Sequence, residues 1–122
     1  MTLFEIIEQV DKTKPNNYSR EDKIKWLSDL DCAIKTELID THEGEALSFA
    51  GYDADTPGNT ELLVPSPYDV VYIAWLESRI DYTNGEINKY NNSNAVFLTA
   101  YSAFERYYNR THMPRGTSFR YF

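Results

Sequence analysis

The fold is decided by one stretch, Glu86 to Asn109, which reads EINKYNNSNAVFLTAYSAFERYYN. Apolar and aromatic side chains recur along it in alternating steps of three and four, which places them in one stripe on a helix. The spacing predicts a helix of about six turns at ~3.6 residues per turn, with an aromatic side that is buried. Residues 91–94 are weak helix formers, but the stripe keeps its phase through them, so we expect one continuous helix. The stripe consists of Ile87, Tyr90, Asn94, Phe97, Tyr101, Phe104 and Tyr108.

A second helix is predicted directly before this stretch. Ser66 stands at the N-cap, Pro67 at the first helical position, and Asp69 completes a capping box. The apolar pattern then continues to about Tyr82, and Asn84-Gly85 ends it because both residues tolerate a left-handed backbone. The short connection predicts an antiparallel helix pair at the centre of the protein.

The first forty residues predict two more helices. Residues 2–12 begin with a capping box and carry one apolar side. A longer helix is predicted from the N-cap Ser19 to about Thr41. Asp31 falls inside its apolar stripe, so we expect Asp31 either at the edge of the buried side or paired with a cation.

The remaining segments lack a helical period. Residues 42–64 contain several glycine and proline residues, which oppose regular structure. Two short apolar runs in this segment, 47–49 and 61–64, predict a small β-hairpin. Residues 110–122 predict an extended tail, because Pro114 and Gly116 oppose a helix. The sequence therefore predicts a single, mainly α-helical domain of about four helices over residues 1–122, with a body at 1–109 followed by the tail.

Charge is distributed unevenly along the 122 residues. The net charge is −7, yet residues 106–122 contain four arginines and no acid. An acidic body repels nucleic acid and anionic lipid, so we expect no sequence-specific nucleic acid and no membrane among the partners. The basic tail is either solvated or in contact with the acidic surface of a neighbouring copy.

Motifs for chemistry are weak in this chain. Residues 53–58 resemble part of a calcium loop, but Pro57 and Val64 stand where ligands belong. His42 has no second histidine at helical spacing, and Cys32 has acidic neighbours that oppose thiolate formation. We find no phosphate-binding glycine loop and no nucleophile elbow. We therefore expect no catalytic residue, no metal, no cofactor and no enzymatic activity.

Several stretches taken together resemble one family of structural proteins. The chain is similar to the head–tail connector (head-completion, or adaptor) proteins of phages and prophages of Gram-positive bacteria. The resemblance covers a little under half of the chain, and the first two predicted helices match only in layout. It implies a helical subunit without catalytic residues, which assembles as a ring below the portal and lets DNA pass. The matching stretches are residues 62–69, 80–86, 90–92 and 107–114.

The resemblance also implies partners and a location. The expected partners are other copies of the chain, arranged head to tail, and virion proteins such as portal or tail components. The expected location is the host cytoplasm during assembly and then the virion. A ring needs two different patches. We expect the acidic segment 42–61, or the second helix, to form one of them. The other patch is expected at Arg110, His112, Arg115, Phe119, Arg120, Tyr121 and Phe122.

Two other functions fit the sequence less well. A DNA-mimicking inhibitor from a phage would need a contiguous acidic surface and a basic protein partner, and the C-terminal arginines argue against it. A small enzyme would need a concave pocket with clustered titratable groups.

Overall fold

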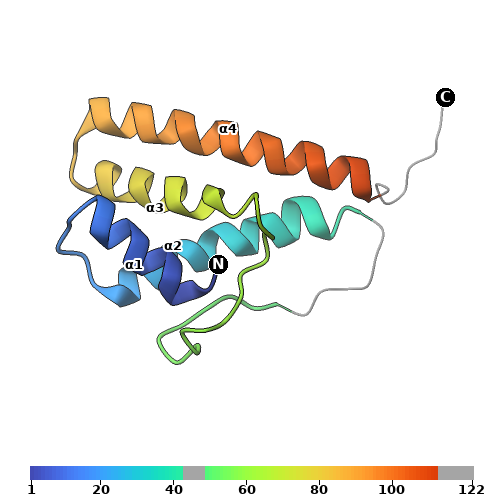
Figure 1. Ribbon diagram of the computed structural model, residues 1–122, viewed down its shortest axis with the longest axis horizontal. Coiled ribbons are helices and arrows are strands. Elements are labelled where there is room, and N and C mark those ends of the chain that lie inside the picture. The colour runs from blue at the N-terminus through green and yellow to red at the C-terminus, as the bar shows by residue number, and fades with distance from the viewer. Residues whose placement is uncertain (43–48, 113–122) are drawn as a thin grey trace.

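A computed structural model describes residues 1–42 and 49–112 of the chain. Its described residues form a mainly helical protein, as predicted, in which a π-helical turn, η1, directly continues the second helix (Figure 1). The elements are α1 (Leu3–Thr13), α2 (Arg20–Ile34), η1 (Lys35–Ile39), α3 (Val70–Thr83) and α4 (Ile87–Thr111).

The predicted central pair is α3 and α4, which run antiparallel and pack along their length (Figure 1). Gly85 adopts a φ of 75° in the connection, which explains why glycine stands there. The aromatic stripe of α4 faces α3, with Phe97 and Phe104 buried. Tyr107 adds a stacked ring contact with Tyr68, at 4.7 Å between centroids. The polar stretch 91–94 remains helical, so the prediction of one continuous helix is confirmed.

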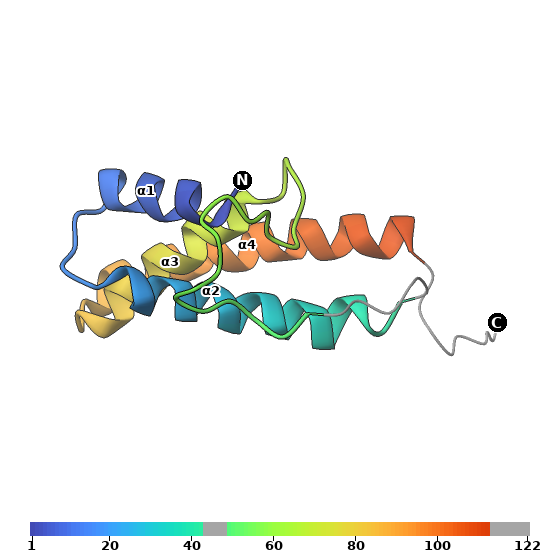
Figure 2. The ribbon, with the colours of Figure 1, turned by 90° about the horizontal axis from the view of Figure 1, so that it is seen from below.

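The helix α3 is the central element, because α1, α2 and α4 all contact it. Seen from below, α3 lies between α1 and α2 (Figure 2). The capping box predicted for α1 is present, since Thr2 and Glu5 exchange side-chain-to-backbone hydrogen bonds. The largest fully buried apolar side chains come from these helices: Tyr72, Phe104, Leu3, Ile6, Ile7, Leu27, Ile34, Leu76 and Ile80.

The predicted start of α3 was wrong by three residues. The helix begins at Val70, and residues 65–69 form a turn closed by a bond from the Tyr68 N–H to the Pro65 carbonyl. The Asp69 carboxylate makes no capping bond, because it lies 2.8 Å from the Met1 ammonium group instead. A tertiary ion pair has replaced the local capping box.

The predicted β-hairpin does not form among the described residues. Glu61 forms an isolated antiparallel bridge with Thr2, and the Leu63 N–H donates to the Asp31 carboxylate. The N–H groups of Leu63 and Val64 thus donate to the side chains of Asp31 and Tyr72 and not to a neighbouring strand. Residues 47 and 48 of the other predicted strand lie outside the described part of the chain.

Candidate interaction surface

A buried carboxylate on α2 holds the segment before α3 in place. Asp31 is fully buried and accepts three hydrogen bonds. The Tyr72 hydroxyl donates to Oδ1 at 2.7 Å, the Tyr52 hydroxyl to Oδ2 at 2.5 Å, and the Leu63 N–H to Oδ2 at 3.2 Å. Tyr72 also accepts from the Val64 N–H at 2.7 Å. One side chain therefore joins α2, α3 and both ends of the segment 52–64.

Both expectations for Asp31 were wrong. It lies neither at the edge of the buried side nor beside a cation: its donors in the described chain are two hydroxyls and an amide. Burial raises the pKa of Asp31 above its usual range, and the hydrogen bonds from Tyr52 and Tyr72 oppose that rise. Burial and the neighbouring carboxylate also raise the pKa of both tyrosines.

The raised pKa of Asp31 predicts a specific pH dependence of stability. The folded protein binds the Asp31 proton more tightly than the unfolded protein does, so the part of the stability that comes from binding this proton is largest at low pH and is lost as pH rises through the folded pKa. We expect the unfolding free energy of wild type, minus that of Asp31→Asn, to increase as pH falls from neutral toward 3.8. Urea unfolding at several pH values measures this difference. A difference that stays constant or falls would contradict it.

The same segment is fixed to α2 by a second set of contacts. The Tyr52 N–H donates to the Ser28 hydroxyl at 2.9 Å, and Gly51 adopts a φ of 104° directly before it. A Cβ at Gly51 would lie 2.5 Å from the Ser28 Oγ, so only glycine fits this close approach. The Asp53 carboxylate then accepts from the Asp55 N–H and closes a turn. Residues 52–54 are thereby held against α2.

Their contact with α2 creates an acidic depression of about 370 Å³. Glu21 and Asp29 come from α2, and Asp53 from the docked segment. Lys25 is the one cation among the lining residues and lies 3.5 Å from Asp29. The sequence offered the segment 42–61 and the second helix as alternative acidic patches. The fold brings residues of both into one surface, the α2–loop depression.

The basic patch predicted at the C-terminus is described only at its beginning. Arg110 is exposed in the last turn of α4, and the ring of His112 stacks on that of Tyr108 at 3.9 Å. The predicted interface residues Arg115, Phe119, Arg120, Tyr121 and Phe122 lie outside the described residues.

His42 connects the end of η1 to the end of α4. Its Nε2 lies 2.6 Å from the Asn109 side-chain oxygen, and its Nδ1 lies 2.6 Å from the Leu38 carbonyl oxygen. His42 is thus a buried structural residue at this end of the bundle. In the described part of the chain, no three His, Cys, Asp or Glu side chains cluster as a metal site would require. No helix in that part is long and apolar enough to cross a membrane.

The sequence interpretation missed the residues that build the α2–loop depression, chiefly Ser28, Asp31 and Tyr52. The signal available was Asp31 itself, an acid in phase with an apolar stripe. Its partners lie 21 to 41 positions away along the chain, so no local pattern names them. Comparison with known proteins adds no relative, since no family model, curated protein or solved structure matches this chain.

Proposed function

We propose that this protein is a structural, non-catalytic subunit of a phage or prophage virion, of the head–tail connector type. It would assemble as a ring by head-to-tail contacts with further copies and with portal or tail proteins. The observation that carries the proposal is the α2–loop depression, an acidic recess on a chain that ends in a basic segment.

The two patches have matching chemistry. The recess presents the carboxylates of Glu21, Asp29 and Asp53 next to the ring of Tyr52. The C-terminal residues 113–122 contain two arginines and three aromatic side chains. Arginine side chains form charge-assisted hydrogen bonds with carboxylates. A contact between two different patches builds a closed ring when its rotation closes. The C-terminal segment of one copy would therefore bind in the α2–loop depression of the next.

Deleting residues 113–122 is expected to abolish assembly without unfolding the body. The helix α4 ends at Thr111 and its contacts with His42 and Tyr68 lie before the deletion, so the fold should remain. Light scattering at several concentrations should find a large discrete oligomer for the full chain and a monomer for the shortened one. Circular dichroism should report unchanged helix content.

Substitutions in the recess provide the matched control. The double change Asp29→Asn and Asp53→Asn should weaken assembly, while Asp55→Asn, outside the lining residues, should not. An oligomer whose mass is the same with and without residues 113–122 would show that this segment does not join the copies.

A further inference from the structure

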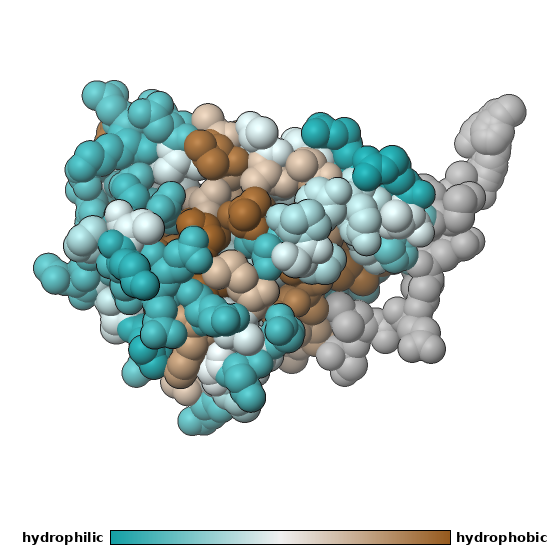
Figure 3. All heavy atoms as spheres, viewed as in Figure 1, coloured by the Kyte–Doolittle hydropathy of each residue, from teal (hydrophilic) through white to brown (hydrophobic). Residues whose placement is uncertain are grey.

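The turn between α3 and α4 joins an asparagine directly to a glycine. Asn84 is exposed, and it is the only asparagine of the sequence that precedes a glycine, Gly85. Figure 3 shows mainly hydrophilic surface at the end of the molecule where α3 joins α4. A Cβ placed on Gly85 would meet no atom of the described residues within 4 Å. The turn is therefore open to water, and nothing crowds the backbone of its glycine.

Two hydrogen bonds polarise the side-chain amide of Asn84. The Tyr18 hydroxyl donates to its Oδ1 at 2.5 Å, and its Nδ2 donates to the Glu86 carboxylate at 3.2 Å. A donor on Oδ1 stabilises the negative charge that an attack on the amide carbon, Cγ, would place on this oxygen. The nearest nucleophile along the chain is the backbone nitrogen of Gly85, whose attack on Cγ would close a five-membered ring.

The backbone of this turn is held by the last hydrogen bonds of α3. The Gly85 N–H donates to the Tyr82 carbonyl at 3.1 Å, and the Glu86 N–H donates to the Asp81 carbonyl at 3.0 Å. Such bonds close the C-terminal end of a helix, and helix ends open far more readily than helix centres. Opening of the first bond frees the Gly85 nitrogen. An attack on Asn84 therefore needs a local opening of an exposed turn and leaves the body folded.

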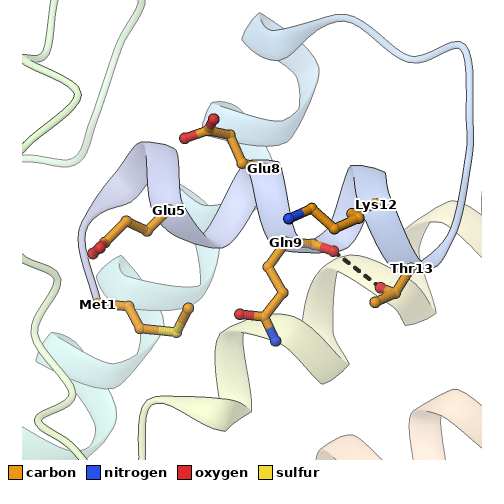
Figure 4. A pocket seen from close by; sticks show the side chains of 6 residues that line it. All are labelled: Met1, Glu5, Glu8, Gln9, Lys12 and Thr13. Carbon is orange, nitrogen blue, oxygen red and sulfur yellow. Dashed lines mark hydrogen bonds between the residues drawn. The ribbon is translucent and has the colours of Figure 1, made fainter.

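The other side-chain amides of the chain do not share this arrangement. Every other asparagine precedes a residue whose side chain crowds the attacking nitrogen. Asn92 and Asn94 also lie within α4, where helical hydrogen bonds hold the nitrogen of the next residue. Gln9, the one glutamine, extends away from α1 at a hollow of about 540 Å³ (Figure 4), and its extra methylene requires a larger ring. Asn84 is therefore the amide best placed to react.

We propose that Asn84 is a site of spontaneous deamidation in the folded protein, with the backbone nitrogen of Gly85 as the nucleophile. That nitrogen forms a bond to the Asn84 Cγ and loses its proton, while the bond from Cγ to Nδ2 breaks and Nδ2 leaves with this proton as ammonia. Water then opens the cyclic imide at either carbonyl, which leaves aspartate or isoaspartate at position 84. No oxidant or reductant takes part. The modification does not depend on the connector function.

Either product changes the contacts of the turn. The new carboxylate adds one negative charge to a chain of net charge −7, and it replaces the donor that Glu86 now accepts, so that two carboxylates face each other. Isoaspartate also lengthens the main chain by one carbon, which displaces the N–H groups of Gly85 and Glu86 from the end of α3. We expect both forms, separated by ion exchange, to unfold at lower urea concentration than the unmodified protein.

Prolonged incubation of the full-length protein at neutral and mildly alkaline pH tests the proposal. Peptide mapping by mass spectrometry should find aspartate and isoaspartate at position 84 before any other asparagine changes. The conversion should be faster at the higher pH, because the Gly85 nitrogen must lose its proton. Water enriched in the heavy oxygen isotope should label the product. Asn84→Gln should abolish the conversion, while Asn92→Gln, a change inside α4, should leave it unaltered.

A sample unfolded in guanidinium chloride and incubated in parallel separates the effect of the fold from that of the sequence. Conversion at position 84 in the native sample, with circular dichroism showing that the body is still helical, supports the proposal. Conversion only in the unfolded sample would show that the folded turn protects Asn84, and would overturn it. Earlier conversion of another asparagine in the native sample would overturn it as well.

Discussion

Replacing Asp31 by alanine is expected to lower the unfolding free energy by about 2–5 kcal/mol. The change removes the acceptor of the Tyr72 hydroxyl and of the Leu63 N–H, and both donors lie in a buried part of the protein. A buried donor without an acceptor costs about 1–3 kcal/mol. The Tyr52 hydroxyl loses its acceptor as well. Urea unfolding followed by circular dichroism measures the loss.

Two controls separate the network from the general effect of removing an acid. Asp29→Ala, on the exposed side of the same helix, removes a surface pair with Lys25 and should cost about 0.5 kcal/mol or less. Tyr52→Phe should cost less than Asp31→Ala, because Asp31 keeps its other two donors. Equal stability of the Asp31→Ala and Asp29→Ala variants would show that the buried carboxylate does not anchor the segment.

Phe104→Ala is expected to lower the unfolding free energy by about 3–5 kcal/mol, because it opens a cavity in a buried aromatic cluster. Phe104 is almost completely buried, and it contacts Tyr68 just before the start of α3. Its ring lies 6.2 Å from that of Tyr68 and 5.9 Å from that of Tyr108, so neighbouring rings lose contacts as well. The same urea titration measures the change.

Two control variants accompany this prediction: one at an exposed position of the same helix, and one with a smaller change in side-chain volume at Phe104. Leu98→Ala, on the exposed side of the same helix, should change stability by about 0.5 kcal/mol or less. Phe104→Leu should fall between the two, since leucine fills part of the space. If Phe104→Ala lowers the unfolding free energy as little as Leu98→Ala does, the aromatic stripe is not the core of the helix pair.

Regular elements were predictable from this sequence, because their signals are local. The stripe predicted for α4 is partly or fully buried from Tyr90 to Tyr108, across the polar residues 91–94. Its first predicted member was wrong, because Ile87 is 62% exposed. The predicted start of α3 was wrong because the interaction that decides it is not local. Ser66 and Pro67 form a good capping pattern, but the ion pair of Asp69 with Met1 joins residues 68 positions apart, and a local pattern carries no trace of such a partner.

The candidate surfaces were only partly predictable. The sequence located acidic residues in both the second helix and the following loop, but not their meeting at Glu21, Asp29 and Asp53. That meeting depends on tertiary contacts of Tyr52 and Asp31.

The buried position of Asp31 makes the core and the α2–loop depression thermodynamically dependent on each other. Its carboxylate never reaches the surface, yet it positions the Tyr52 segment on which Asp53 stands. Substitutions at Asp31 and Asp53 should therefore show epistasis rather than additive effects. A mutational scan scored by assembly alone would count Asp31 among the contact residues, although it acts only through the shape of the recess.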